Sequence, residues 1–418
     1  MQLDAEERAM LAGELGPVRK IALEHQIKVG EFFRARDFVR VTQAHIMADT
    51  ESLGEAGVAW LERLANHPSK ERRVRVPTIT DPRGTDFEHA AKLKQAPWML
   101  ELERRAIEAF VKLGVMMTNT CINYQTVLPA TRGEHVAFGD TGVVIYSNSV
   151  CGARSNFEGG PSALAAGLTG RTPRYGFHLD ACRRATLALR VDWRPSSLDD
   201  WGALGALIGK LAGNYWAVPV IQGLRSAPGS DALKHFGAAM ASFGSVALYH
   251  IVGSTPEAAR YEDVAEHKLA EHRVTEAEVH ALRAMYRGDG AVDVVVFSAP
   301  QLSLMELAEL AELCEGKRFR MPLFAVTSPQ VKPDAERIGL VQKIETAGGT
   351  VLAGMCFYQS YAREMAEANG WKRLATNSAK LVNILGGYGY QPILASMAEC
   401  VDAARTGTLR GQSTKGFS

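Results

Sequence analysis

The strongest constraint on the fold of this chain is the alternation of short apolar runs with amphipathic segments in its C-terminal half. Residues 292–297, 322–326 and 350–353 are apolar runs of strand length. Helical segments separate them, and one is predicted to begin at Ser303 with Glu306 completing a capping box. Strands that alternate with helices are typical of parallel sheets covered by helices. The sequence therefore predicts an α/β fold with parallel or mixed sheets.

The rest of the chain gives weaker patterns of the same kind. A second capping box, Ser396 with Glu399, predicts a helix near the C-terminus. Further predicted helices cover residues 6–36, with a break near Gly16-Pro17, and 99–113, and further predicted strands cover residues 38–41, 74–79, 245–252 and 391–395. With 418 residues the chain is long enough for more than one lobe, and we expect approximate lobes at 1–225 and 226–418.

Composition narrows the function classes. A net charge of +1 and the lack of a basic stripe argue against nucleic acid and anionic membranes as partners. The acidic N-terminus has no signal-peptide pattern, and the longest apolar runs are too short to cross a bilayer, so we expect a cytoplasmic protein. Six cysteines without CxxC pairs disfavour a disulfide framework and leave buried thiols or metal ligands.

Three of these cysteines lie at predicted strand ends. Cys121 and Cys356 follow apolar runs directly, and Cys400 lies in the first turn of the helix after a strand. In parallel sheets the carboxyl ends of strands form the edge where ligands bind. Three converging thiolates would suit an iron–sulfur cluster with one iron open to substrate. The alternative is that each is a small buried core residue, which is the commoner role of a free cysteine.

Residues 133–174 differ in character from the rest. They are crowded with glycine, asparagine, serine and single charges, with little clean periodicity. Polar, glycine-rich segments of this length in a compact enzyme are usually functional, and a long surface connection is the alternative.

Long motifs in this segment carry a resemblance to a known family. They read GEHVAFGDT from Gly133, SNSVCGARSN from Ser147, EGGPSAL from Glu158 and LTGRTP from Leu168. Others follow in the family's order along nearly the whole chain, including Thr120-Cys121, Gly176-Phe177-His178-Leu179, Thr376-Asn377-Ser378-Ala379-Lys380 and Glu399-Cys400. On these motifs the chain resembles the aconitase X family.

The resemblance implies an aconitase-like fold and an iron–sulfur cluster, of unstated nuclearity, on Cys121, Cys356 and Cys400. It also implies a small swivelling domain that closes the site. No such domain is recognisable in this sequence, so we expect it on a separate small subunit, giving a heterodimer. The family's reactions remove water from cis-3-hydroxy-L-proline or from mevalonate 5-phosphate, both small β-hydroxy carboxylic acids.

Such an elimination needs donors for the carboxylate and groups that move a proton. We expect Arg154, with Ser149 and Asn156, to hold the carboxylate, because a guanidinium binds a carboxylate through two parallel hydrogen bonds. Glu134, His135, Asp140 and Glu158 are candidates for handling protons or for supporting the groups that do, and Lys380 for offsetting the charge of the cluster or substrate. The general base is left unassigned, since the small subunit is one place for it.

One departure from the family bears on the reaction. The family commonly has histidine where this chain has Gln301, in Ser298-Ala299-Pro300-Gln301-Leu302-Ser303. The motif Phe138-Gly139-Asp140-Thr141 is closer to the sequences of bacterial family members. This resemblance favours cis-3-hydroxy-L-proline as substrate, with mevalonate 5-phosphate as the alternative. A homologue that kept the fold and lost the chemistry is a further alternative.

Overall fold

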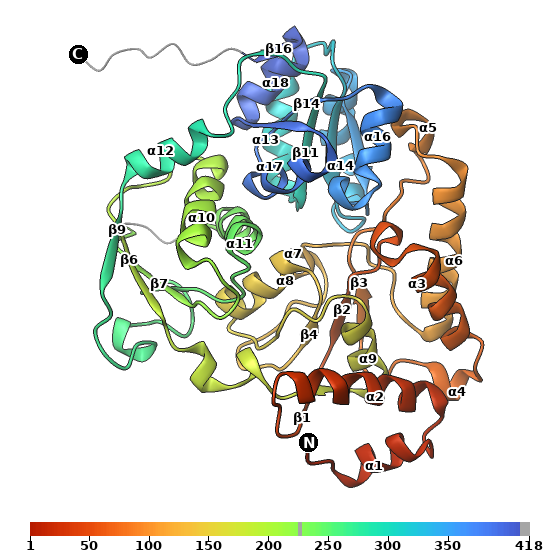
Figure 1. Cartoon of the computed structure of the whole chain (residues 1–418). Helices are drawn as coiled ribbons and strands as arrows, with labels where there is room; N and C mark the ends of the chain where they lie inside the picture. Colours follow the sequence, from red (N-terminus) through yellow and green to blue (C-terminus); the bar gives the residue numbers. More distant parts are fainter. Residues whose placement is uncertain (225–227, 410–418) are drawn as a thin grey trace.

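The computed structural model describes residues 1–224 and 228–409 and shows a mixed α/β protein (Figure 1). Its three larger sheets have three, four and five strands, and all strand pairs within them are parallel. Two further pairs, β1–β5 and β10–β16, are antiparallel. The predicted class, parallel sheets covered by helices, is confirmed.

The three-stranded sheet, in the order β3-β2-β4, belongs to the N-terminal part of the chain. Its strands are short: β2 (Ala44–Ile46), β3 (Thr78–Thr80) and β4 (Ala137–Phe138). The helices around it are α2 (Pro17–Phe32), α3 (Thr50–Ala65), α6 (Pro97–Leu113) and α9 (Pro161–Thr169). Their apolar faces share one core, in which Val58, Phe110 and Leu164 are buried with Ile46 of the sheet.

The four-stranded sheet, in the order β8-β7-β6-β9, lies at the left of Figure 1 with α10 (Leu198–Ala212) and α11 (Ser230–Gly244) on its inner side. Its strands are β6 (Leu187–Val191), β7 (Pro219–Gln222), β8 (His250–Ile251) and β9 (Glu271–Val274). The two helices pack backbone to backbone. A Cβ at Gly205 would overlap the Phe236 carbonyl, so this approach requires glycine.

The five-stranded sheet, in the order β13-β12-β11-β14-β15, forms the C-terminal part. Its strands are β11 (Val294–Leu302), β12 (Leu323–Thr327), β13 (Thr350–Ala353), β14 (Arg373–Thr376) and β15 (Gln391–Leu394). Its helices are α13 (Leu304–Cys314), α14 (Lys332–Arg337), α15 (Leu340–Thr346), α16 (Ala362–Asn369), α17 (Ala379–Leu385) and α18 (Met397–Thr406).

The remaining elements connect these three parts. They are α1 (Ala5–Ala12), β1 (Phe38–Arg40), α4 (Ser69–Arg72), α5 (Ala90–Leu93), α7 (Asn123–Thr126), α8 (Thr141–Tyr146), β5 (Arg171–Pro173), α12 (Glu276–Ala284), β10 (Gly290–Ala291) and β16 (Thr408–Leu409).

Most predicted elements are present, with two shifts. The strand predicted at 245–252 is reduced to His250–Ile251, because residues 245–249 form no strand pairing with the described part of the chain. The strand predicted at 74–79 begins only at Thr78. Residues 133–174 are not a long surface connection, since β4, α8, α9 and β5 occupy much of the segment. The lobe boundary predicted at 225/226 falls outside the described residues.

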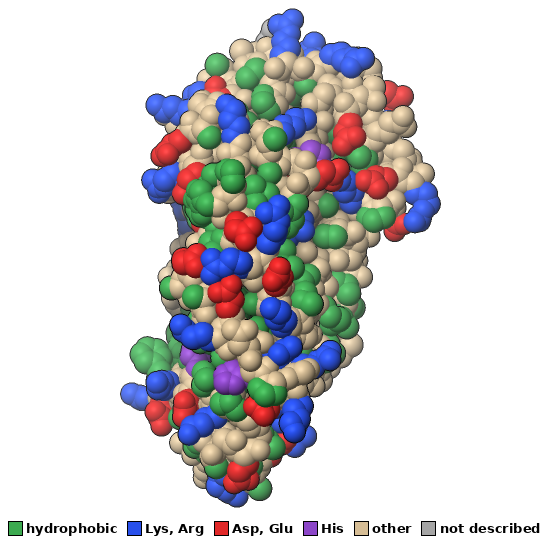
Figure 2. Space-filling model, turned by 90° about the vertical axis from the view of Figure 1, so that its right-hand side faces the viewer, with side chains coloured by type: hydrophobic (Ala, Val, Ile, Leu, Met, Phe, Trp, Pro, Cys, Tyr) green, Lys and Arg blue, Asp and Glu red, His purple; other side chains and the backbone are tan. Residues whose placement is uncertain are grey.

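Within the described residues, no helix combines the length and apolarity needed to cross a membrane. On the face shown in Figure 2, basic and acidic side chains are interspersed rather than gathered by sign.

Candidate active site

Three buried aspartates follow the three strands of the N-terminal sheet. Asp49 lies just beyond β2, Asp81 directly after β3 and Asp140 just beyond β4. Because the strands are parallel, their carboxyl ends share one edge, and the three carboxyl groups gather there. Asp81 is within electrostatic reach of both others, and burial together with their charges raises its pKa well above the ordinary value.

The C-terminal sheet presents its own carboxyl edge to this one. Gln301 lies near the end of β11, Cys356 follows β13, and Lys380 lies in the first turn of α17 after β14. The Nζ atom of Lys380 lies 3.3 Å from Oδ2 of Asp140, and both side chains are buried. This ion pair joins the edges of two sheets whose strands are far apart in sequence.

Two thiols lie at the junction. Cys121 and Cys356 are buried and lie within electrostatic reach of each other, of Lys380 and of both Asp81 and Asp140. Burial and the nearby carboxylates raise the pKa of both thiols, and Lys380 opposes that effect. We call these five residues, Cys121, Cys356, Lys380, Asp140 and Asp81, the thiol site.

Lys380 and Asp140 have partners in the thiol site, whereas Asp81 has no hydrogen-bond partner among the described residues. Burial alone would lower the pKa of Lys380, but Asp140 and the neighbouring acidic groups outweigh it and raise that pKa. Asp140 also accepts a hydrogen bond of 2.9 Å from the Val143 amide as the N-cap of α8. Both carboxyl oxygens of Asp81, by contrast, are buried without a hydrogen-bond partner. An orphaned buried carboxyl is costly unless it is protonated or meets a ligand.

His45 lies beside Asp81. Its Nε2 atom is 2.8 Å from the Thr120 carbonyl oxygen and 3.8 Å from Oδ1 of Asp81, and burial lowers its pKa. Sequence reasoning missed Asp81 and His45 as site residues. A usable signal was present for Asp81, namely an acidic residue directly after a strand of a parallel sheet.

Of the other predicted residues, the structure brings Lys380 and Asp140 to the thiol site. Arg154 and His135 are paired at the amino end of β4, opposite the end that carries Asp140. The Arg154 guanidinium donates to the His178 carbonyl at 3.1 Å and to the Asp180 carboxylate. Nδ1 of His135 lies 2.9 Å from Nδ1 of His178.

The remaining four predicted residues are engaged in other contacts. Glu158 accepts from the Thr172 hydroxyl at 2.9 Å. The Ser149 hydroxyl accepts from the Tyr249 amide at 2.9 Å. The Asn156 side chain donates to the Tyr175 carbonyl at 3.1 Å and accepts from the Phe177 amide at 3.1 Å. Glu134 accepts from the Thr131 amide at 2.6 Å and from the Thr42 hydroxyl.

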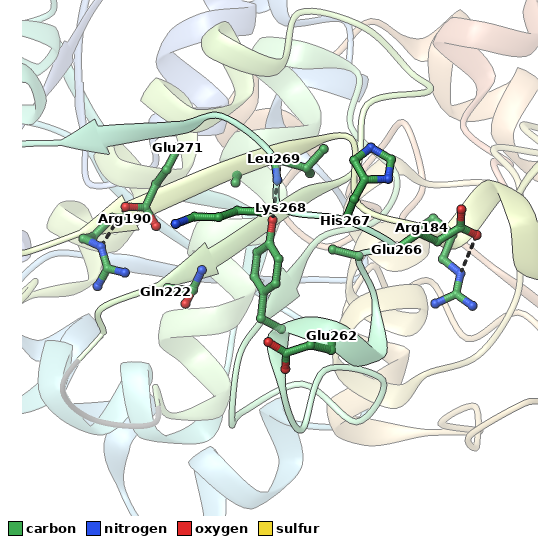
Figure 3. A pocket seen from close by; sticks show the side chains of 12 residues that line it. Arg184, Arg190, Gln222, Glu262, Glu266, His267, Lys268, Leu269 and Glu271 are labelled. Atoms are coloured by element: carbon green, nitrogen blue, oxygen red, sulfur yellow. Dashed lines mark hydrogen bonds and ion pairs between the residues drawn. The ribbon is translucent and has the colours of Figure 1, made fainter.

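A large surface hollow, of about 760 Å³, lies elsewhere, against β6, β7 and β9 (Figure 3). Four of its charged lining residues form two ion pairs, with Arg190 and Glu271 2.8 Å apart and Arg184 and Glu266 3.8 Å apart. It contains none of the predicted residues, and the thiol site is therefore the candidate for catalysis.

Comparison with known proteins places this geometry in a family. Models of the aconitase X first, second and third domains match residues 1–181, 185–286 and 292–406 in turn. The phosphomevalonate dehydratase large subunit of Methanosarcina mazei is 34% identical over 415 residues, which cover 98% of each chain. The chain belongs to the aconitase X family.

Other aconitase X relatives carry a second reaction name. The cis-3-hydroxy-L-proline dehydratase of Pseudomonas aeruginosa is 32% identical over 415 residues, covering 96% of this chain and 70% of that protein. The crystal structure of Thermococcus kodakaraensis aconitase X in its holo-form matches with a TM-score of 0.87 and 31% identity, covering 97% of this chain and all of that one. The predicted family and aconitase X fold are confirmed, and the named relatives are dehydratases.

The cluster implied by the aconitase X resemblance can be tested against the residues present. The structure brings Cys121 and Cys356 together but not Cys400, whose thiol lies 3.9 Å from the Ala395 carbonyl oxygen. The charged neighbours of Cys400 are Glu399, Asp199 and Arg287, none of which belongs to the thiol site. Throughout residues 1–224 and 228–409, no three His, Cys, Asp or Glu side chains are placed to hold a metal ion. The described residues do not fit a three-cysteine cluster, and we assign no reaction step to one.

Proposed function

We propose that this chain is the large subunit of a dehydratase that removes water from a small β-hydroxy carboxylic acid at the thiol site. The orphaned buried carboxyl of Asp81, beside the Lys380–Asp140 pair, carries the proposal. It lies where the carboxyl edges of two parallel sheets meet, which is where ligands bind in such folds. The dehydratase names of the aconitase X relatives support the same reaction class.

The chain's own groups suit two tasks of the elimination. A base must take the proton from the carbon next to the carboxylate while the β-hydroxyl leaves with a proton as water, so that a carbon–carbon double bond forms. Asp81 in its ionised form is the candidate base, because a carboxylate whose pKa is raised is a stronger proton acceptor than an ordinary aspartate. The Lys380 ammonium is the candidate partner of the substrate carboxylate.

The charge balance favours cis-3-hydroxy-L-proline as the substrate. Asp49, Asp81 and Asp140 are buried near a single paired ammonium, Lys380. A substrate that brings its own cation, such as the ring ammonium of this imino acid, offsets that excess of carboxyl groups. Mevalonate 5-phosphate brings only negative charge. It remains the alternative because several relatives are named for that reaction.

A separate small subunit is part of the proposal. The phosphomevalonate relatives are named large subunits, and this chain covers 98% of the Methanosarcina mazei protein. We propose that a small swivelling subunit closes the thiol site and completes the heterodimer.

Anaerobic co-expression with a candidate small subunit tests the function. The assay follows loss of cis-3-hydroxy-L-proline and formation of the cyclic imine, with mevalonate 5-phosphate in parallel. Asp81→Asn is expected to lower kcat by about 10²–10⁴-fold, the usual contribution of a general base. Asp334→Asn, an exposed aspartate that is paired with Arg337 outside the thiol site, is the matched control and is expected to leave kcat near the unmodified value.

The roles predicted for Arg154, Ser149, Asn156, Glu134 and His135 stay predictions, and the same assay addresses them through Arg154→Met. Loss of turnover in that variant with retained turnover in Asp81→Asn would move the chemistry away from the thiol site. Turnover of neither acid by the intact heterodimer would favour the homologue that lost the chemistry.

A further inference from the structure

Gln301 lies between the two loops that carry the thiols. Its side chain is fully buried, although glutamine is a polar residue. The Nε2 atom donates to the carbonyl oxygens of Asn119, at 3.2 Å, and Met355, at 3.3 Å. These two residues lie two positions before Cys121 and one position before Cys356. One amide group therefore binds both thiol-bearing loops.

Two further contacts bind Gln301 to Cys121 itself. The Oε1 atom accepts from the Cys121 amide at 3.3 Å, and the Gln301 amide lies 3.4 Å from the Cys121 sulfur as donor. All three polar atoms of the side chain and backbone amide are thus committed to the two loops.

Gln301 is itself anchored from the opposite side. Lys234 of α11 donates from Nζ to the Gln301 carbonyl oxygen at 3.1 Å, and it is paired with Glu306 in the first turn of α13 and with Asp231 at 3.2 Å. His235 lies 2.6 Å from the second oxygen of Glu306. This buried network fixes the end of β11, so the glutamine is a rigid attachment point for both loops.

We infer that Gln301 is the positioning residue of a two-thiol site, in which it holds Cys121 and Cys356 together in place of a third cysteine, and that Cys400 takes no part. The inference concerns the site of the proposed function and deepens it. It follows from the hydrogen bonds of Gln301 and from the separate surroundings of Cys400, so its test does not depend on turnover of either substrate.

Site-resolved alkylation of the full chain tests the positioning role. Gln301→Leu removes the side-chain bonds to both loops, and we expect iodoacetamide to modify Cys121 and Cys356 about tenfold faster, which corresponds to about 1.4 kcal/mol of local stability. Cys314 and Cys400, also buried, serve as internal controls and should keep their rates. Mass spectrometry of peptides reports each thiol separately.

Gln26→Leu is the matched control variant. Gln26 is another buried glutamine, whose side chain bonds the Arg171 carbonyl and the Thr169 hydroxyl in a different part of the fold. Gln26→Leu should leave the alkylation rates of Cys121 and Cys356 unchanged. Gln301→Glu keeps the acceptor oxygen and loses the two N–H donors, so it should raise both rates. An unchanged Cys356 rate in Gln301→Leu, or an equal rise at all four cysteines, would overturn the positioning role.

Iron binding tests the two-thiol part of the inference. The full chain is reconstituted anaerobically with ferrous iron and sulfide, and iron, sulfide and visible absorption are measured per chain. We expect Cys400→Ala to match the unmodified protein, while Cys121→Ala and Cys356→Ala lose whatever iron it binds.

One result of the iron measurement would contradict the two-thiol site. If Cys400→Ala loses iron as completely as Cys121→Ala while its near-ultraviolet circular dichroism stays unchanged, Cys400 is a ligand and the two-thiol site is wrong. Cys400→Val provides a second variant in case the smaller side chain destabilises the core. Failure of the proposed function would leave these readouts unaffected, so the two failures are distinguishable.

Discussion

At the scale of single residues, the Lys380–Asp140 pair gives the thiol site a measurable energetic signature. Both charges are buried, and removal of one partner leaves the other without compensation. Lys380→Met is expected to lower the free energy of unfolding by about 3–5 kcal/mol. Asp140→Asn keeps an N-cap for α8. The double variant Lys380→Met/Asp140→Asn should therefore recover much of the free energy of unfolding that Lys380→Met loses. Urea denaturation of the four proteins measures the cycle, and simple additivity of the two losses would contradict the coupling.

A second residue-scale prediction concerns pH. Glu103 is buried, accepts from the Thr50 hydroxyl at 2.8 Å and the Gly84 amide at 3.1 Å, and burial raises its pKa from 4.5 to about 7. Between these values the folded protein binds a proton that the unfolded chain releases, so stability falls as pH rises through this window. Glu103→Gln keeps the acceptor oxygen and cannot ionise.

The variant should therefore unfold like the unmodified protein at pH 4.5 and be more stable at pH 8, by up to roughly 3 kcal/mol. Other buried carboxyls with raised pKa values, those of Asp49 and Glu158 among them, leave part of the pH dependence in place. Denaturant unfolding at pH 4.5, 6 and 8 checks the difference. If both proteins lose the same free energy of unfolding between pH 4.5 and pH 8, Glu103 is already charged in the folded protein across this range.

At the scale of elements, the α10–α11 contact depends on glycine. Gly205→Ala would place a methyl group against the Phe236 carbonyl in a contact without space, and overpacking of this kind costs about 1–3 kcal/mol. Gly386→Ala is the matched control, because its φ is −56° and a Cβ there meets nothing within 4 Å. A thermal shift in Gly205→Ala no larger than in Gly386→Ala would show that the helices adjust at no cost.

Elements were predictable from the sequence where local signals specify them. The capping boxes at Ser303 and Ser396 place the starts of α13 and α18 correctly, and the apolar run after Gly349 is strand β13. The site strands gave weaker signals, since β4 has two residues and β2 and β3 have three each. Such strands are defined by their neighbours in the sheet, which no local pattern reports.

The contacts within the site were less predictable for the same reason. Cys121 and Cys356 were expected to meet because strand ends share an edge, and the structure brings them together. Cys400 satisfies the same rule, yet its thiol points to the Ala395 carbonyl, and its charged neighbours are Glu399, Asp199 and Arg287. Which way a side chain faces from a strand end depends on packing between elements. Two partners of Gln301, Cys121 and Asn119, are 180 and 182 residues away in sequence, and the third, Met355, is 54 residues away.

At the scale of the whole molecule, the thiol site is divided between two parts of the chain. Asp81, Cys121 and Asp140 belong to the first family domain, and Cys356 and Lys380 to the third. A ligand bound at the proposed site would contact both carboxyl edges and should stabilise their docking. Beyond the ion pair, Arg83 links the same parts by bonding from its amide to the Gly354 carbonyl at 2.8 Å.

Hydrogen exchange of the heterodimer with and without cis-3-hydroxy-L-proline tests this division. We expect slower exchange in peptides around Thr120 and around Phe357 together, because ligand binding shifts the opening equilibrium of every segment that the bound state requires. Peptides of β9, which lies on the far four-stranded sheet, serve as the internal control. Protection confined to one edge would mean that the acid binds one sheet alone, and protection around Arg154 instead would place the substrate at the amino end of β4.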